Sequence, residues 1–193
     1  TVTRGSGKRG YTPDFQAKPR SILVAQSDHM TDNPGVRCGL AETQWADQPQ
    51  LAGLKLLART EQVLAAGEAA MAGWDDAIML DARDQVISSS RGNIFVVSGE
   101  KILTPDLSRC GIAGTRRQLL IDSILPSLGF EADVCSLGWD QLITAEAVAI
   151  TNAVNGIAEV AALGDTAMPA GGAHGLVSRI REAMTEYLCH GLT

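Results

Sequence analysis

Short apolar runs of the strand type alternate along this chain with stretches of helical periodicity. Residues 77–80, 93–97 and 145–151 are largely apolar and short enough to be buried strands. Residues 54–73 and 111–128 have the apolar spacing of helices, and a glycine stands at or just beyond the end of each. Because strands and helices interleave, the sequence predicts a mixed α/β fold.

The connections between these runs indicate several hairpins. Residues 81–85 form a predicted turn into a return strand that begins at Val86, and residues 98–100 join strands 93–97 and 101–103. The remaining predictions are strands at 21–25, 35–42 and 132–136, a short helical turn at 138–144, an irregular stretch at 164–175 and a C-terminal helix at 176–188.

Composition narrows the possible partners. The chain has 193 residues and a net charge of −6, which argues against a nucleic-acid partner. No apolar run approaches the roughly 18 residues that a membrane span needs. The four cysteines lack metal-ligand spacing, so we expect free thiols in a reducing cytoplasm.

Lys55 is the candidate catalytic residue. The sequence places it at a loop-to-helix junction, between Leu54 and Leu56. Apolar surroundings favour the neutral amine that attacks a carbonyl carbon. Spacing alone does not separate this role from that of a solvated lysine at the start of a helix.

The segment around this lysine resembles a known family. Residues 51–65, LAGLKLLARTEQVLA, resemble the active-site segment of the aminodeoxychorismate lyases, which belong to the class-IV aminotransferases, pyridoxal-phosphate (PLP) enzymes of fold type IV. Further segments resemble family segments in the same order, namely 4–11, 76–81, 93–97, 104–114 and 147–157.

The resemblance implies a domain organisation. The match begins after the small N-terminal domain of a family member, so residues 1–13 would be the remnant of that domain with the interdomain loop. Residues 14–193 would be the large PLP-binding domain, with a mixed sheet or barrel-like core and flanking helices. The family also implies a cytoplasmic homodimer that acts on a small molecule.

The resemblance also implies a cofactor site. Lys55 would be the Schiff-base lysine, and the phosphate of PLP would contact the amides of Thr115 and Arg116 beside Gly114, with Asn152 and Ala153 closing the other side. A helix is also predicted to begin at residues 111–115, and the unpaired backbone N–H groups at the start of a helix bind anions. These groups favour a phosphate site independently of the resemblance.

Two pairs of residues near the predicted site have separate predictions. The family implies that Arg9 and Tyr11 hold the substrate. The neighbouring Arg116 and Arg117 are predicted to be surface charges.

At two positions the chain departs from the family pattern. Ser88 stands where the family has a glutamate that pairs with the pyridine nitrogen, so a charged partner for that nitrogen is absent at this position. Ala58 replaces an asparagine that commonly follows the lysine.

The implied activity is a PLP-dependent lyase that converts 4-amino-4-deoxychorismate to 4-aminobenzoate, a folate precursor, and pyruvate. The alternatives are a D-amino-acid or branched-chain aminotransferase of the same fold, and a truncated or degenerate class-IV domain without catalysis.

Overall fold

The computed structural model describes residues 1–7, 9–25, 35–169 and 172–190. Residues 1–31 and 32–193 form two compact units. In the first unit, β1 (Val2–Thr3) pairs antiparallel with β2 (Arg20–Ser21). The predicted strand at 21–25 is therefore wrong beyond Ser21, and the predicted boundary after residue 13 lies within this unit.

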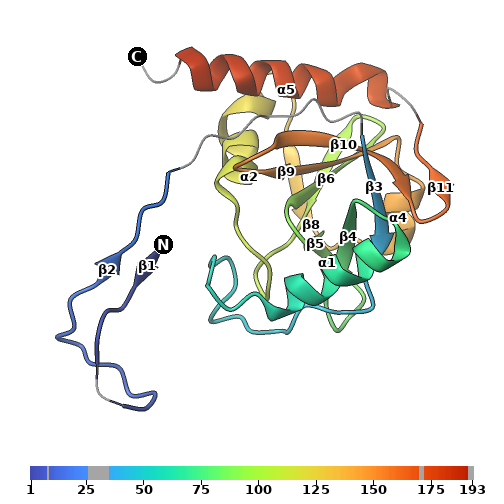
Figure 1. Cartoon of the computed structure of the whole chain (residues 1–193). Helices are drawn as coiled ribbons and strands as arrows, with labels where there is room; N and C mark the ends of the chain where they lie inside the picture. Colours follow the sequence, from blue (N-terminus) through green and yellow to red (C-terminus); the bar gives the residue numbers. More distant parts are fainter. Residues whose placement is uncertain (8, 26–34, 170–171, 191–193) are drawn as a thin grey trace. The chain divides into compact units, whose positions relative to one another are not determined.

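The second unit is built on a mixed sheet (Figure 1). Its order in the described part of the chain is β5-β4-β3-β10-β9-β6-β7-β8, and β11 pairs with β10. The β3–β4, β3–β10 and β7–β8 pairs are parallel and the others antiparallel. The strands are β3 (Val36–Leu40), β4 (Asp76–Leu80), β5 (Val86–Ser89), β6 (Asn93–Ser98), β7 (Lys101–Pro105), β8 (Ala132–Cys135), β9 (Ala147–Asn152), β10 (Gly156–Leu163) and β11 (Thr166–Ala167).

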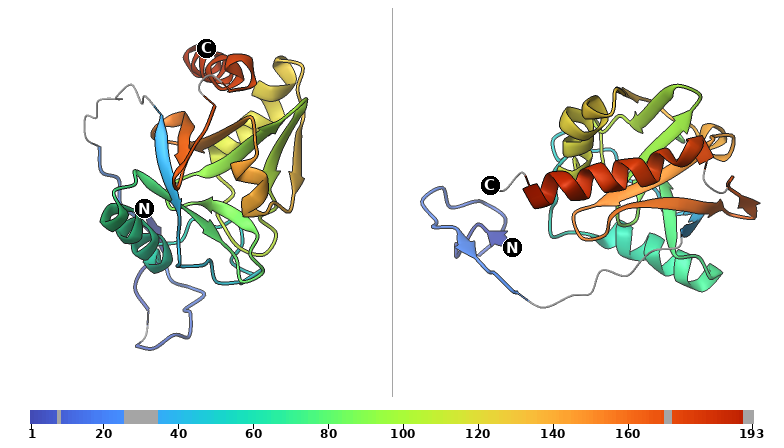
Figure 2. Two further views of the ribbon diagram at one scale, coloured as in Figure 1. Left: turned by 90° about the vertical axis from the view of Figure 1, so that its right-hand side faces the viewer. Right: turned by 90° about the horizontal axis from the view of Figure 1, so that it is seen from above.

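The sheet curls into a half-barrel. In the order of the sheet, four strands separate β5 from β6, yet along the chain only the turn at residues 90–92 joins them. The Ser89 N–H donates to the Gly92 carbonyl oxygen at 2.9 Å, which closes this turn. Because the edge strand must return to an inner strand, the sheet between them bends, as Figure 2 shows. The predicted mixed α/β class and barrel-like core are confirmed.

Alternating side chains of the strands divide the core into layers. On β6, Ile94 and Val96 face a cluster inside the curl, whereas Phe95 and Val97 face the cluster below the C-terminal helix. The residues of β4 alternate in the same way, with Ile78 packed inside the curl. A strand buried on both faces reads as a continuous apolar run, which is why the sequence predicts these two strands correctly.

Helices cover both sides of the sheet (Figures 1 and 2). The C-terminal helix and the helical segment from α2 pack on one side, and α1 packs on the other. The helices are α1 (Thr60–Ala72), α2 (Thr115–Leu119), the π-helical turn η1 (Leu120–Ile124), α3 (Leu125–Ser127), α4 (Trp139–Ile143) and α5 (Gly172–His190).

Helix α1 begins later than the sequence predicts. Its first residue is Thr60, so residues 54–59 belong to the preceding loop. Its end is predicted correctly, because Gly73 adopts the left-handed conformation that terminates a helix. The large apolar residues of α1 do not form its buried face: Val63 and Leu64 are exposed, and alanines such as Ala65 pack on the sheet.

The two predicted hairpins, the helical segment after residue 111 and the short α4 are confirmed. The prediction that residues 164–175 lack regular structure is wrong, because this stretch contains β11 and the first residues of α5. The sequence pattern also does not indicate β10, although this strand lies between β3 and β9 near the middle of the sheet.

Candidate active site

A cavity of about 560 Å³ opens where the turns of the curled sheet meet the loop before α1. Its lining includes every residue of the second unit that the sequence predicts for the cofactor site. These are Lys55, Ser88, Gly114, Thr115, Arg116, Asn152 and Ala153. The structure therefore brings together residues from four separate segments of the chain.

Lys55 lies in the loop between Gly53, which forms a bridge to Ile112, and the start of α1. Its side chain is exposed at the cavity wall. The flanking Leu54 and Leu56 are also exposed, at 51% and 38%. The predicted helix junction at Lys55 is wrong, because α1 begins only at Thr60. Leu54 and Leu56 flank Lys55 but do not enclose it, and Lys55 lines the same cavity as the other predicted residues of this unit.

The turn at Gly114 lines the cavity at the point where α2 begins. Gly114 precedes α2, and the Gln118 N–H is the donor that bonds back to the Gly114 carbonyl oxygen, at 3.0 Å. The amides of residues 115–117 therefore have no partner within the helix. A Cβ added at Gly114 would lie 2.2 Å from Asn93 Oδ1, so a glycine is needed for this close approach.

The two arginines after this turn have different environments. Arg116 is half-buried and lines the cavity. Arg117 is 8% exposed, and its guanidinium donates to Thr104 Oγ1 at 3.2 Å and to the Pro105 carbonyl oxygen at 3.0 Å. Burial lowers the pKa of Arg117 below its usual range. The prediction of two surface charges is wrong, because Arg117 anchors the helix to β7.

The turn between β9 and β10 forms another part of the cavity wall. The Asn152 side chain holds this turn, since its Oδ1 accepts hydrogen bonds from the N–H groups of Val154 at 3.0 Å and Asn155 at 2.8 Å. Ala153 follows with an exposed side chain. These bonds keep the backbone at residues 152–153 against the cavity.

Ser88 contributes a buried hydroxyl to the cavity, with 4% of the residue exposed. Trp45 Nε1 donates to Ser88 Oγ at 2.9 Å, and Ser88 Oγ in turn donates to the Ser89 carbonyl oxygen at 2.8 Å. One acceptor lone pair of this hydroxyl stays free for a group in the cavity.

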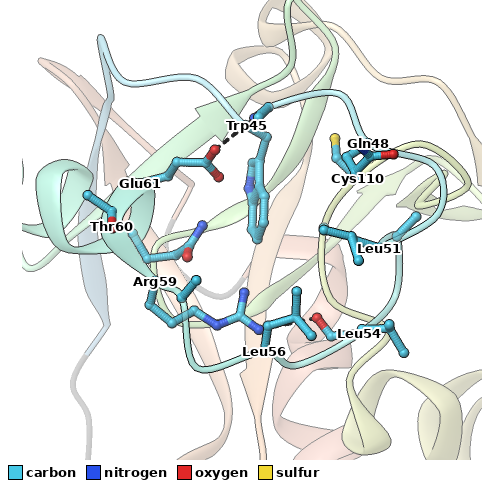
Figure 3. Close-up of a pocket in the computed structure, with 14 residues that line it drawn as sticks. Trp45, Gln48, Leu51, Leu54, Leu56, Arg59, Thr60, Glu61 and Cys110 are labelled. Carbon is cyan, nitrogen blue, oxygen red and sulfur yellow. Dashed lines mark hydrogen bonds between the residues drawn. The ribbon is translucent and has the colours of Figure 1, made fainter. Parts of the chain in front are cut away.

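A smaller cavity of about 220 Å³ adjoins the first (Figure 3). Trp45, Arg59 and Gln62 line both cavities. The remaining wall is mainly apolar, with leucines from the loop before α1 and Cys110.

Sequence reasoning does not identify Trp45, Arg59 and Gln62 as residues of the site. The available signal is weak, because Trp45 is an isolated aromatic residue in the polar stretch 42–50 and the other two follow the candidate lysine at helical spacing. Arg9 and Tyr11 belong to the first unit, and their role in binding a substrate stays a prediction.

Neither a cluster that could hold a metal ion nor a helix that could span a membrane is found among the described residues. Residues 1–7, 9–25, 35–169 and 172–190 contain no cluster of His, Cys, Asp and Glu side chains that could hold a metal ion. The helices in that part of the chain include none that is both long and apolar enough to cross a membrane.

Comparison of the sequence with known proteins identifies a family and a curated relative. The family model for amino-transferase class IV matches residues 1–163. An aminodeoxychorismate lyase of Vibrio harveyi is 33% identical over 166 residues, which are 84% of this chain and 61% of that protein. The chain thus spans about three fifths of the length of this curated relative.

Solved structures give the same picture. The 4-amino-4-deoxychorismate lyase of Pseudomonas aeruginosa superimposes with a TM-score of 0.84 at 35% identity, over 96% of this chain and 68% of that one. The branched-chain aminotransferase of Thermoproteus uzoniensis, solved with norvaline, has a TM-score of 0.73 at 25% identity, over 78% and 50%. An aminotransferase of Brucella abortus bound to PLP shares the fold, with a TM-score of 0.76 at 17% identity, over 84% and 57%. With its family model covering most of its length and a curled mixed sheet that matches these structures, the chain belongs to the amino-transferase class IV family.

Proposed function

We propose that this chain is the cofactor-binding domain of a PLP-dependent carbon–oxygen lyase that converts 4-amino-4-deoxychorismate to 4-aminobenzoate and pyruvate. One observation carries the proposal: Lys55 lines the same cavity as the free amides that follow Gly114. An amine and an anion site in one cavity are what a phosphorylated aldehyde requires. The lyases of Vibrio harveyi and Pseudomonas aeruginosa, each at least 33% identical, favour this activity among those of the family.

The residues fit PLP by their donor chemistry. The amides of Thr115 and Arg116, at the start of α2, would supply N–H groups for a phosphate, and Asn152 and Ala153, which line the same cavity, would close its other side. Ser88 would meet the pyridine ring with its remaining lone pair. The PLP bound to the Brucella abortus aminotransferase, together with membership of the class IV family, supports the same cofactor.

Lys55 would have two tasks. Its amino nitrogen would hold the cofactor and, once displaced by the 4-amino group of the substrate, would remove the proton at C4. The chemistry that bound PLP supplies is storage of the electron pair left at C4. The enolpyruvyl C–O bond would then break, the leaving enolpyruvate would take up the proton held by Lys55 and become pyruvate, and the ring would become aromatic.

The proposal extends to partners and location. Arg9 and Tyr11 would hold the substrate, as the family resemblance implies. Exposed leucines around Lys55, such as Leu54 and Leu57, are apolar surface that a second copy could cover in a homodimer. The four cysteines are free, which is in keeping with the cytoplasm.

A branched-chain aminotransferase is the second candidate, favoured by the likeness to the Thermoproteus uzoniensis enzyme. Ser88 argues against it, because a neutral hydroxyl cannot stabilise a protonated pyridine by charge as a carboxylate does. Amino-group transfer from D-alanine or leucine to the bound cofactor would identify an aminotransferase, and release of pyruvate from 4-amino-4-deoxychorismate would identify the lyase.

The decisive test is reductive trapping. The protein is incubated with PLP, reduced with borohydride and digested, and the pyridoxyl group is located by mass spectrometry. We expect one adduct, on Lys55, and none at this position in a Lys55→Ala variant that still folds. Adducts spread over Lys18, Lys55 and Lys101 alike, or none at all, would refute the proposed cofactor site.

A further inference from the structure

Arg59 and Gln62 stand at the wall between the two cavities. Arg59 is the residue before α1, and Gln62 follows it at the spacing that places two side chains on one face of a helix. Both line each cavity together with Trp45. Neither residue has a role in the proposed catalytic chemistry.

Both side chains carry a buried donor without a partner. Within the described part of the chain, Arg59 Nε and Gln62 Nε2 are inaccessible to solvent and donate no hydrogen bond. Gln62 as a whole is only 7% exposed. An unpaired buried donor is costly, and two such donors on one wall of a cavity are the features of a site that a ligand acceptor completes.

The Arg59 guanidinium also has no ion pair among the described residues. The nearby Glu61 carboxylate instead accepts from the Ala46 N–H at 3.2 Å and lies toward Trp45 in Figure 3. Burial lowers the pKa of Arg59 below its usual range, and the charge of Glu61 only partly opposes this shift. A partly buried cation at the positive end of a helix favours an anion beside it.

A hydrogen bond fixes this cation close to the candidate lysine. Arg59 Nη2 donates to the Leu54 carbonyl oxygen at 3.2 Å, and Leu54 directly precedes Lys55. The unpaired Nε therefore belongs to a guanidinium whose position is tied to the backbone of the Lys55 loop.

We propose that Arg59 and Gln62 form a binding site for an anionic oxygen next to Lys55. The inference rests on the proposed function, and two ligands there offer such an oxygen. One is a carboxylate of the substrate, and the other is the ring phenolate of PLP. Each would accept hydrogen bonds from Arg59 Nε and Gln62 Nε2 and offset the charge of Arg59.

The test uses a pair of probes that differ only in a carboxylate. Calorimetry compares 4-aminobenzoate with aniline, on protein with and without PLP, for the parent chain and for Arg59→Gln and Gln62→Glu. The second variant keeps the side-chain volume but places a carboxylate beside Arg59. Arg37→Gln, which removes an exposed arginine on β3, is the matched control for charge.

If the oxygen is a substrate carboxylate, both variants bind 4-aminobenzoate at least about tenfold more weakly, because a charge-assisted hydrogen bond is lost. Aniline binding stays within about twofold, and the Arg37→Gln variant matches the parent. If the oxygen is the phenolate, 4-aminobenzoate binding is unchanged. The pH titration of the visible absorbance of bound PLP then moves upward in Arg59→Gln, because the guanidinium no longer opposes protonation of the chromophore.

No change in either measurement for both variants would overturn the inference, as would an equal change in Arg37→Gln. If Arg59→Gln does not fold, Gln62→Glu decides alone. Trapping of PLP on Lys55 is measured in every sample. If 4-aminobenzoate binding depends on Arg59 but no adduct forms on Lys55, the proposed function is refuted and the anion site is kept. If an adduct forms on Lys55 but neither variant changes either measurement, the anion site is refuted and the proposed function is kept.

Discussion

The indole N–H of Trp45 donates to the hydroxyl oxygen of Ser88 at 2.9 Å, and so joins two residues 43 positions apart in the sequence. The Ser88 proton is directed to the Ser89 carbonyl oxygen. Ser88 can therefore offer a group in the cavity an acceptor but no donor. A ring nitrogen facing it would need its own proton to make a hydrogen bond.

This pair predicts measurable coupling. Trp45→Phe removes the donor and Ser88→Ala removes the acceptor, and urea denaturation gives the free energy of unfolding of both variants and of the double variant. We expect a coupling energy of about 0.5–1.5 kcal/mol, because each single change leaves a buried polar group unpaired. Strict additivity of the two changes would show that the hydrogen bond contributes nothing.

Two glycines should respond oppositely to the same substitution. Gly114→Ala forces a Cβ to within 2.2 Å of Asn93 Oδ1, so we expect about 1–3 kcal/mol of destabilisation and weaker binding of PLP. Gly67→Ala, in the middle of α1 with no atom near its added Cβ, should stabilise the chain by about 0.5–1 kcal/mol. Thermal denaturation and PLP titration check both. Equal effects at the two positions would contradict the close approach at Gly114.

The cysteines should differ in reactivity. Burial, followed by the charges of Asp81 and Asp47, raises the pKa of Cys110 to about 11, so its thiol stays protonated at pH 8. Cys189 is exposed on α5. With iodoacetamide at pH 8 we expect Cys189 to be labelled much faster than Cys110, as followed by peptide mass spectrometry. Labelling at equal rates in the native chain, and not only in the denatured control, would contradict this burial.

Asp81 predicts a specific dependence of stability on pH. Its burial opposes ionisation, but hydrogen bonds from the Gln85 N–H and from Arg83 outweigh this and hold the pKa of Asp81 below its usual value. The contribution of the ionised carboxylate is complete above about pH 3.9, the ordinary pKa of aspartate, and is lost as the pH falls through the lower folded value.

We therefore expect the free energy of unfolding of the parent chain to fall more steeply below about pH 4 than that of Asp81→Asn. Asp133→Asn, an exposed change on β8, should keep the parent profile. Parallel curves for the parent and Asp81→Asn would refute the role of Asp81.

The sequence predicts local structure well where the signal is local. The hairpin of β6 and β7 and the helix end at Gly73 depend on turn residues and on runs buried on both faces. The sequence does not predict strand β10, because the alanine-rich residues 156–163 have no clear period and one of its two main pairings is remote, with Val160 beside Val36.

The sequence also does not predict the correct start of α1. Leucines before Thr60 imitate a helical face, but the structure exposes Leu54 and Leu57 and packs Ala65 and Ala69 on the sheet. Small side chains let the helix approach β4 closely, and no pattern of large apolar residues reveals that choice. The gathering of Lys55, Ser88 and Asn152 could be predicted by family resemblance, whereas the unpaired donors of Arg59 and Gln62 are visible only in the folded chain.

The position of β10 has a consequence for biosynthesis. Until β10 has left the ribosome, β3 and β9 lack the strand that lies between them. The turn at residues 152–155, which lines the cavity, then leads from β9 into a strand that is not yet available. The pairing of β3 with β10 spans a long sequence separation and is slow compared with hairpin formation. We therefore expect the nascent chain to acquire its binding cavity late and in one step, after its local hairpins have already formed.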